Sequence, residues 1–412
     1  MSEAEAIQWT NALSTRPSLE SAVQEIVTQV QQTLNAPGDL GIVFISSAFE
    51  SEYPRLIPLI QEQLEIPVMV GCSGGGIVGR TSAGIVQEVE GKVALSLSVG
   101  HLPGVILHPF LVAPETLPDL DGPPNQWIDL IGVSPQDNPS FIIFADPMAS
   151  GLNDFLQGID FAYPGAVKVG GLASSGASSG RTCVFAKDDL YFGHIAGVAL
   201  SGNIKLDAIV AQGCRPIGPV YRVVEGERNI ILQLQPEDGG SESQPPLKAL
   251  QDMLDTLNDA DREKIQHSLF VGIAQSEFKV TLEPGDFLIR QPMGIDPRIG
   301  ALAIGDRVRP GQRIQFHLRD AQASAEDLDT LLTRYQLEQS TTTSKAVGAL
   351  MFSCLGRGEN LYQKPNFDSG MCTRILKNVP VSGFFCSGEI GPVGNTTFIH
   401  GFTSVFGILR QP

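Results

Sequence analysis

The amino-acid sequence predicts an α/β fold of two domains, in which mixed sheets are flanked by helices. One pattern occurs at 40–101, 140–200 and 346–410: a strand, a helix, a second strand, a glycine-rich turn and a hairpin. The first strand of each unit is an almost continuous apolar run, which is typical of a strand covered on both faces of its sheet. The chain has 412 residues, more than one domain usually holds. We interpret the three units as duplications of one structural unit.

The elements around these units follow from local signals. Apolar residues recur at helical spacing over 19–34, and Ser18 is placed to cap the first turn of that helix. Hairpins are predicted at 84–101, 181–200 and 397–409, where two apolar stretches flank a short polar turn.

The chain is predicted to divide at 236–246. This segment contains Glu, Asp, Gly, Ser, Gln and Pro and has no aliphatic or aromatic residue, which is typical of a connection rather than of a core element. We therefore predict a first domain at 1–235, a linker at 236–246 and a second domain at 247–412.

The second strand of each unit runs into a turn of small residues. These turns are Gly71–Gly76, Gly170–Gly176 and Cys386–Gly391. Glycine permits positive φ and lets other groups approach the backbone closely, so such turns suit either the wall of a site or a tight corner. Only the third turn contains a carboxylate, that of Glu389. We predict that the first two are structural corners and that the third belongs to the functional site.

A candidate ligand site combines two loops that follow neighbouring strands, Cys354–Gly358 and Cys386–Gly391. Ligands bind where the ends of strands meet loops. Arg357 offers a planar fork of donors to a carboxylate or phosphate, and Glu389 could hold an ammonium group. Together they would suit a zwitterion such as an amino acid; the alternative is that they pair with each other as a structural ion pair. The predicted ligand-binding residues are Arg319, Cys354, Arg357, Cys386, Ser387, Gly388 and Glu389.

Arg319 enters this set because it ends a strand and precedes the helix 324–337, so that its side chain could point to the same cleft. The neighbouring Asp320 is predicted to cap that helix.

Composition and charge disfavour several function classes. The formal net charge of −17 argues against electrostatic binding to nucleic acid or to an anionic membrane. No apolar run approaches the ~18 residues of a membrane span, and the start of the chain lacks the apolar region of a secretory signal. The six cysteines show no zinc-site spacing, which favours free thiols in the cytoplasm.

The sequence offers little support for catalysis. Gly71-Cys72-Ser73-Gly74-Gly75 matches the G-x-S-x-G pattern of hydrolases, but poor helix formers follow it, whereas that motif requires a helix. A cysteine nucleophile would need a histidine base, and no histidine stands out by its neighbours. We predict a protein that is not an enzyme and has no metal site. Haem stays open as a cofactor, because it needs only one axial histidine and six are present.

Several stretches along most of the chain resemble the FIST family, whose members carry paired FIST-N and FIST-C domains, and the FIST-C-like stretches occur in the order found in that family. The FIST-N-like stretches are Gly41–Phe44, Gly71–Ser73 and Val169–Gly171. The FIST-C-like stretches are Asp286–Arg290, Gln315–Ala321, Phe352–Gly358 and Phe384–Gly391.

This resemblance implies a sensory module for small ligands, with amino acids proposed as the ligands. It assigns 1–235 to a FIST-N-like and 247–412 to a FIST-C-like domain, which leaves no segment for an output domain. We therefore expect a cytoplasmic module that reports a small metabolite to a separate signalling protein. Two alternatives are a haem protein that senses nitric oxide, as some bacterial relatives are described, and a protein-interaction adaptor without a small ligand.

Overall fold

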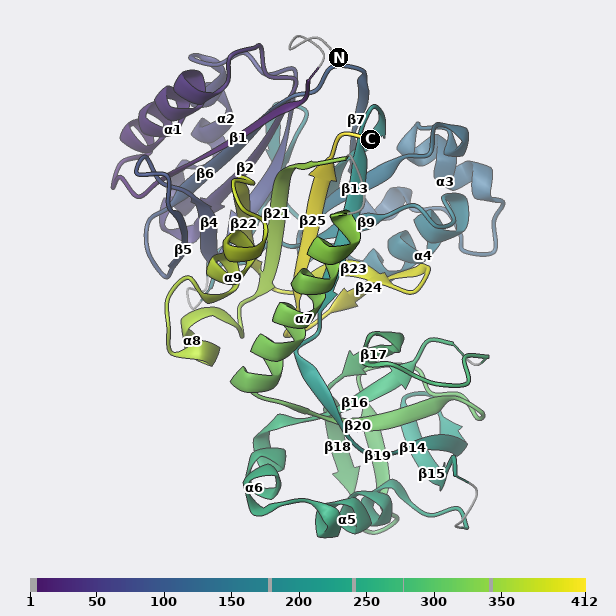
Figure 1. The fold of residues 1–412 in the computed structure, drawn as a ribbon. Helices are drawn as coiled ribbons and strands as arrows, with labels where there is room; N and C mark the ends of the chain where they lie inside the picture. The colour runs from purple at the N-terminus through teal and green to yellow at the C-terminus, as the bar shows by residue number, and fades with distance from the viewer. Residues whose placement is uncertain (1–5, 177–179, 239–241, 277, 341–343) are drawn as a thin grey trace. The chain divides into compact units, whose positions relative to one another are not determined.

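A computed structural model describes residues 6–176, 180–238, 242–276, 278–340 and 344–412 (Figure 1). The chain forms two compact units. The main unit comprises Met1–Ala211 and Asp329–Pro412, and the inserted unit comprises Gln212–Leu328. The α/β class, with several mixed sheets flanked by helices, is confirmed.

These units divide the chain differently from the boundary predicted at 236–246. That segment lies inside the inserted unit, where it connects two elements of the same unit. The physical reason is a long-range pairing: β13 (Lys205–Ala211) runs antiparallel to β25 (Ser404–Arg410) over its whole length. The C-terminal part of the chain therefore completes a sheet of the main unit.

The main unit consists of three repeats with the same order of elements. The first repeat contains β1 (Gln8–Ser14), α1 (Leu19–Thr33), β2 (Leu40–Ser46), α2 (Tyr53–Gln61), β3 (Val68–Gly74), β4 (Gly76–Arg80), β5 (Val86–Glu90) and β6 (Leu95–His101). The second contains β7 (Val105–Val112), α3 (Pro124–Ile131), β8 (Ser140–Ala145), α4 (Leu152–Ala162), β9 (Lys168–Leu172), β10 (Val184–Ala186), β11 (Asp189–Tyr191) and β12 (Ile195–Gly202).

The third repeat is interrupted by the inserted unit, which begins after its first strand and ends at Leu328, within its first helix. It contains β13, α7 (Ala321–Gln339), β21 (Ala346–Cys354), α8 (Gly358–Tyr362), α9 (Phe367–Ile375), β22 (Val381–Cys386), β23 (Glu389–Val393), β24 (Thr396–His400) and β25. The prediction of three equivalent units is thus confirmed, but all three lie in one compact unit.

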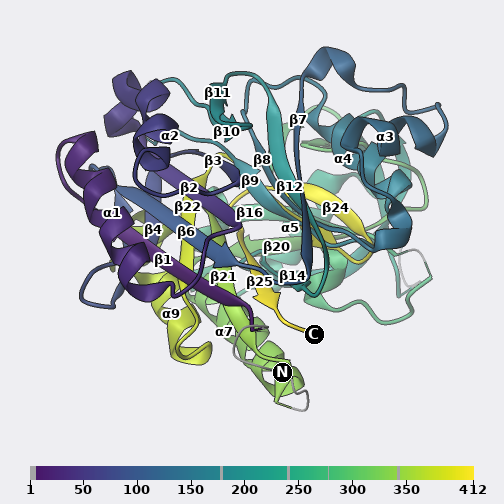
Figure 2. The same ribbon diagram turned by 90° about the horizontal axis from the view of Figure 1, so that it is seen from above.

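Each repeat builds four neighbouring strands of one six-stranded sheet. The strand orders of these four strands are β1-β6-β2-β3, β7-β12-β8-β9 and β13-β25-β21-β22. In each order the last two strands are parallel to each other, and the other neighbours are antiparallel. Figures 1 and 2 show α1 and α2 on one side of the first of these sheets, and α3 and α4 together beside the second. The apolar side chains of these two helix pairs bury against their own sheets.

The last two strands of every sheet come from a different repeat. The hairpin β10–β11 of the second repeat completes the first sheet, β23–β24 of the third completes the second, and β4–β5 of the first completes the third. The three repeats therefore exchange their hairpins in a closed cycle. The predicted hairpin at 84–101 is wrong, because β5 pairs with β4 and β6 pairs with β1 and β2. The predicted hairpin at 397–409 is wrong for the same reason, since β24 pairs with β23 and β25 pairs with β13 and β21.

Three equivalent glycines allow the parallel strands to lie this close. Gly71, Gly170 and Gly383 are in register with Val43, Ile143 and Met351, at the same position of each parallel pair. A Cβ atom on any of these glycines would lie 1.8–1.9 Å from the carbonyl oxygen of its register partner. No side chain fits there, so glycine is a steric requirement of the repeat.

A cluster of phenylalanine rings joins the three repeats. Phe44, Phe144 and Phe352 occupy equivalent positions on β2, β8 and β21, and all three are fully buried. The ring of Phe384 lies between them, with centroids 5.0 Å from Phe44, 6.3 Å from Phe144 and 5.9 Å from Phe352. The centre of the main unit is therefore an aromatic core to which every repeat contributes.

The inserted unit is a second α/β body with its own core. Its seven-stranded sheet has the order β17-β16-β20-β14-β15-β19-β18, and its apolar core lies between this sheet and α5 and α6. The elements are β14 (Cys214–Glu227), β15 (Ile230–Pro236), α5 (Pro246–Thr256), α6 (Asp259–Ser268), β16 (Leu269–Ala274), β17 (Phe287–Arg290), β18 (Pro292–Asp296), β19 (Ala301–Ile304) and β20 (Arg313–Arg319).

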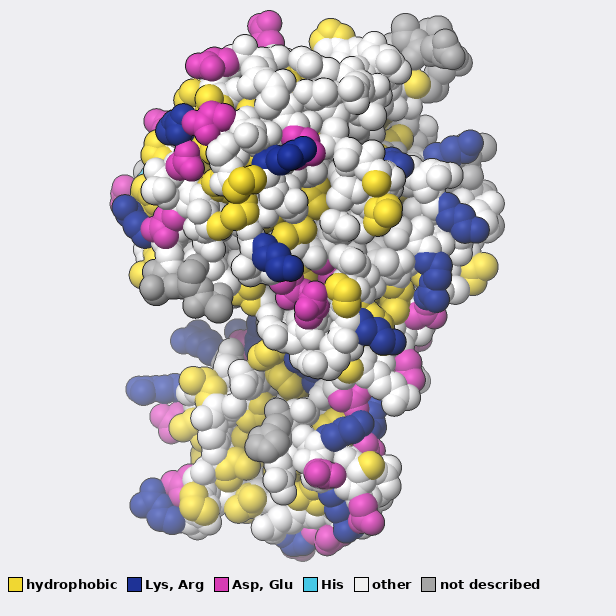
Figure 3. Space-filling model, turned by 90° about the vertical axis from the view of Figure 1, so that its left-hand side faces the viewer, with side chains coloured by type: hydrophobic (Ala, Val, Ile, Leu, Met, Phe, Trp, Pro, Cys, Tyr) yellow, Lys and Arg dark blue, Asp and Glu magenta, His cyan; other side chains and the backbone are white. Residues whose placement is uncertain are grey.

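Within the described residues, no helix has the length and hydropathy needed to cross a membrane. On the face drawn in Figure 3, acidic and basic side chains are interspersed rather than gathered into a region of one sign.

Replacing Phe384 by alanine is expected to destabilise the main unit by about 3–5 kcal/mol, because the ring is buried and the surrounding rings cannot all move into the cavity. Chemical denaturation measures this loss. Phe161→Ala is the matched control, since 55% of that residue is exposed. Equal losses for the two variants would contradict a central role for the phenylalanine cluster.

Candidate functional site

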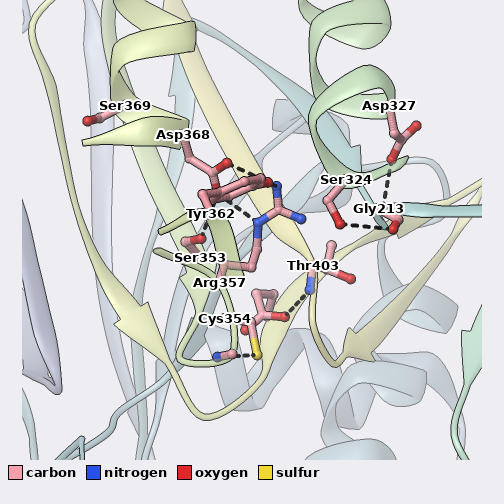
Figure 4. Close-up of polar contacts among 12 residues, drawn as sticks. Gly213, Ser324, Asp327, Ser353, Cys354, Arg357, Tyr362, Asp368, Ser369 and Thr403 are labelled. Carbon is pink, nitrogen blue, oxygen red and sulfur yellow. Dashed lines mark hydrogen bonds and ion pairs between the residues drawn. The ribbon is translucent and has the colours of Figure 1, made fainter. Parts of the chain in front are cut away.

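The Arg357 side chain is fully buried in a polar network at the start of α8 (Figure 4). Its Nε donates to Asp368 Oδ2 at 2.7 Å and its Nη2 to Asp368 Oδ1 at 3.0 Å. Nη2 also donates to the hydroxyl of Tyr362 at 2.5 Å, and Ser353 Oγ donates to Asp368 Oδ2 at 3.1 Å. Asp368 therefore pairs with Arg357 in a bidentate geometry that fixes both side chains.

The sequence prediction missed Asp368 as a member of this network. The residue lies in the first turn of α9, 11 positions after Arg357 along the chain. The only available signal was an acidic residue at the beginning of a predicted helix, which is an ordinary place for a carboxylate. Nothing in the local pattern distinguished it from a solvent-exposed residue.

A second buried carboxylate reaches this network from the exchanged hairpin of the first repeat. Glu88 of β5 is 6% exposed, and its Oε1 accepts a hydrogen bond from Ser369 N at 2.6 Å. Its backbone N–H donates to Asn366 Oδ1 at 2.7 Å. Burial raises the pKa of Glu88 to about 7, and the nearby carboxylate of Asp368 is the second largest cause of this rise. The hairpin is thus bound to α9 through a titratable contact.

Glu389 is also fully buried, at the start of β23. It accepts a hydrogen bond from Thr403 N at 3.1 Å. Its position in the exchanged hairpin is equivalent to that of Ile77 and Val184 in the other two repeats. The three residues pair with Gly171, Phe384 and Cys72 respectively, each of which directly follows the equivalent glycine of its strand. A carboxylate stands where the other repeats have apolar core residues. A role of Arg357 and Glu389 in ligand binding stays a prediction.

The three glycine turns meet at one place. Ser174 connects them: its Oγ accepts from Gly75 N at 2.8 Å and donates to the carbonyl of Phe385. Ser387 N donates to Leu172 O at 3.1 Å. A Cβ atom on Gly75 would lie 2.4 Å from the backbone nitrogen of Gly176, so the first two turns are in direct contact. The first two turns are thus neighbours of the third.

A pocket of about 440 Å³ lies beside the second and third turns. Its lining residues come from loops of the second and third repeats: Asp146, Pro147, Met148, Ser175, Gly176, Gly180, Arg181, Thr182, Phe192, Gly193, Leu355 and Ser387. Of the residues predicted to bind a ligand, Ser387 lines this pocket.

Asp146 holds the walls of the pocket together. It follows β8, is 2% exposed, and its Oδ1 accepts hydrogen bonds from Met148 N at 3.0 Å and Thr182 Oγ1 at 2.9 Å. Its Oδ2 accepts from Gly193 N at 2.7 Å. One buried carboxylate therefore fixes three loops relative to one another, which gives the pocket a preformed shape.

Arg181 supplies the positive charge at this pocket. Its guanidinium carbon lies 3.9 Å from the centroid of the Phe192 ring, a cation–π contact that orients the group while its donors stay accessible. Serine hydroxyls of the second and third turns, from Ser175 and Ser387, stand among the other lining groups. The arrangement is suited to holding a small anionic or zwitterionic molecule.

The two cysteines predicted to bind a ligand differ in their surroundings, and their role stays a prediction. Cys354 is half-buried and its sulfur accepts from Gly356 N at 3.5 Å. Cys386 is fully buried, and its burial raises the pKa of the thiol well above the ordinary value. All six cysteines are free thiols. Gly388 contributes its backbone, since its carbonyl accepts from Leu172 N at 2.8 Å.

The remaining residues singled out by the sequence have structural surroundings of their own. Asp320 caps α7 as predicted, since its Oδ1 accepts from Ala323 N at 2.7 Å. Arg319 ends β20 in the inserted unit, and its place in the site stays a prediction. Ser73 of the G-x-S-x-G stretch is buried and accepts from Cys183 N at 3.1 Å. No group of three potential metal ligands occurs among the residues that the structure describes.

Comparison with known proteins identifies the family. Residues 39–237 match the model of the FIST N domain, and residues 246–392 match that of the FIST C domain. The chain therefore belongs to the family of proteins with paired FIST N and FIST C domains, which are generally associated with sensory signalling and small-ligand binding.

Curated relatives match most of the length of the chain. An uncharacterised protein of Mycobacterium tuberculosis is 30% identical over 394 residues, which is 95% of this chain and 97% of the relative. An uncharacterised protein of Mycobacterium bovis is 30% identical over 396 residues, 95% of each chain. Among solved structures, that of PurLQS from Thermotoga maritima aligns with 98% of this chain and 72% of its own at 10% identity, but its TM-score of 0.20 supports no conclusion.

Arg357→Ala is expected to destabilise the protein by about 3–5 kcal/mol, because it leaves the buried carboxylate of Asp368 without its charged partner. Denaturation of Arg357→Ala, Asp368→Ala and the double variant measures the coupling. The double variant should lose less than the sum of the single losses. Additive losses would show that the pair contributes no coupling energy. Arg334→Ala, at the exposed surface of α7, is the control for loss of an arginine that is not buried.

Glu88→Gln should change the pH dependence of stability. The folded-state pKa of about 7 exceeds the reference value of 4.5, so the folded protein retains a proton that the unfolded chain releases between these values. The stabilisation is present below about pH 4.5 and is lost as pH rises through 7. The free energy of unfolding of Glu88→Gln, taken relative to that of the unmodified protein, should therefore be about 1–3 kcal/mol higher at pH 8 than at pH 4.5. A constant difference, as expected for exposed Glu62→Gln, would contradict this.

Proposed function

We propose that this FIST protein is a cytoplasmic sensory module that binds a small metabolite in the pocket beside the second and third glycine turns and reports it to a separate signalling protein. The observation that carries the proposal is the preformed pocket itself, in which the buried carboxylate of Asp146 fixes the loops and Arg181 presents its guanidinium. The family's association with sensory signalling supports the same function.

The ligand that fits these groups is a small molecule with a carboxylate, and an amino acid is one candidate. Its carboxylate would bind the guanidinium of Arg181, which already lies on the Phe192 ring and so loses little freedom on binding. The hydroxyls of Ser175 and Ser387 can donate to the ligand or accept from it. Such a site holds its ligand by hydrogen bonds and charge, and the proposed role is binding rather than catalysis.

The connection of the pocket to all three repeats gives binding a route to the rest of the main unit. Ser174, next to the pocket residue Ser175, bonds to the first and third turns. A ligand that orders these turns would alter contacts of all three repeats. A signalling partner could recognise that difference on the surface of the main unit.

The first test is a thermal-shift screen of the full chain against the twenty amino acids and small carboxylates. A ligand at about 100 times its dissociation constant should stabilise the folded state by about 2.7 kcal/mol. Arg181→Ala should remove the shift produced by any ligand found, because the carboxylate loses its partner. Arg334→Ala, which removes an exposed arginine of the main unit away from this pocket, should keep the shift.

Two results would count against the proposal. A shift that survives in Arg181→Ala would move the binding site away from this pocket. A screen in which no compound stabilises the unmodified protein would remove the support for a carboxylate ligand.

A further inference from the structure

The central strand β20 of the inserted unit has one apolar and one polar face. Ile314, Phe316 and Leu318 belong to the core of the inserted unit. Because side chains alternate along a strand, Arg313, Gln315 and His317 lie on the opposite face. The polar side chains of this second face do not belong to the apolar core of the inserted unit.

A groove runs along this polar face. Two hollows of about 520 Å³ and 330 Å³ share Val220, Glu237 and Val280 as lining residues and are therefore continuous. Arg313 lines the first hollow and Gln315 the second. A bulge in β14 opens the groove, since the register with β20 shifts between Ile217 and Val220.

Arg313 is a charged group built into the floor of the groove. It is 5% exposed, and its Nη2 donates to the carbonyl of Ser276 at 2.5 Å. Its Nη1 lies 3.6 Å from Glu237 Oε1, beyond hydrogen-bond distance. Its Nε is buried and has no hydrogen-bond partner among the residues that the structure describes. A buried guanidinium donor without an acceptor costs free energy, which a bound acceptor would recover.

The walls of the groove are apolar where they face the solvent. Phe278 and Val280 are each 94% exposed, and Pro219, Val220, Leu282 and Pro284 line the same surface. Exposed side chains of this size lose contact with water only when another molecule covers them. The groove thus combines one buried cationic donor with a larger apolar surface.

The neighbouring charges limit the ligand to a single negative charge. Glu237 pairs with Arg222 at 3.0 Å, and Lys279 pairs with Asp286 at 2.7 Å. Asp238 and Glu283 also line the groove. A phosphate dianion would meet these carboxylates, whereas a carboxylate brings one charge to the Arg313 guanidinium and matches its planar geometry.

We propose that this groove of the inserted unit is a second ligand site, which binds an amphipathic monocarboxylate. The carboxylate accepts from Arg313 Nε, and the apolar chain covers Val220, Phe278 and Val280. This site shares no lining residue with the pocket of the main unit, so variants of either site can test its proposal without the other.

The test is calorimetric titration of the full chain with octanoate, with octanol and acetate as probes of the apolar and charged parts alone. We expect saturable binding of one octanoate per chain and at least tenfold weaker binding of octanol and acetate. Arg313→Gln should weaken octanoate binding about tenfold to a hundredfold, because it removes a charge-assisted hydrogen bond. Arg309→Gln, at an exposed arginine of the same unit, should bind as the unmodified protein does.

Two further variants keep the test decisive if Arg313→Gln fails to fold. Glu237→Gln removes the carboxylate next to Arg313 Nη1 and should tighten octanoate binding about threefold or more. Phe278→Ser changes an exposed side chain and should weaken binding by removing apolar contact. Arg334→Ala, at an exposed arginine of the main unit, should leave octanoate binding unchanged.

The proposal is overturned if octanoate does not bind, if octanol binds as tightly as octanoate, or if Glu237→Gln weakens binding. Binding of inorganic phosphate in place of octanoate would overturn it as well, because the site would then recognise a different anion.

Discussion

The close packing of three parallel strand pairs around one set of phenylalanine rings is the constraint on which the main unit depends. The rings of Phe44, Phe144 and Phe352 can meet only if each repeat presents its central strand to the same point. A glycine on the neighbouring strand lets the backbones of each pair approach at the equivalent position. Phe384 fills the centre that the smaller Cys72 and Gly171 leave in the other repeats. The symmetry of the backbone thus accommodates one asymmetric core residue.

The exchange of hairpins follows from this arrangement and explains which parts of the fold the sequence could predict. Strands, helices and their order within a repeat depend on local patterns, and the Ser18 cap of α1 was predicted correctly. The pairing of β4 with β22 could not be predicted, because the two strands are more than 250 residues apart along the chain. The pairing of β13 with β25 has the same origin. Such pairings are fixed by tertiary packing, for which a single sequence carries no periodic signal.

The candidate site shows the same division between local and long-range information. Small residues after a strand correctly indicated a turn, and Ser387 was placed beside a pocket. Charge alone, however, did not reveal that Arg357 would be fully buried against Asp368. Arg181 and Asp146 stayed unnoticed because they follow different strands and meet the third turn only through the fold. An arginine in a glycine-rich loop is therefore weak support for a ligand contact until its burial and partners are known.

The position of the inserted unit suggests how the two proposed sites could act together. It begins directly after β13 and ends at Leu328 within α7, so its two ends continue into two elements of the third repeat. Strand β13 pairs along its whole length with β25, and Tyr335 of α7 donates to Asp207 of β13 at 2.8 Å. If a ligand in the groove altered these contacts and thereby the affinity of the main-unit pocket, linkage would require a ligand in that pocket to change the affinity of the groove by the same factor.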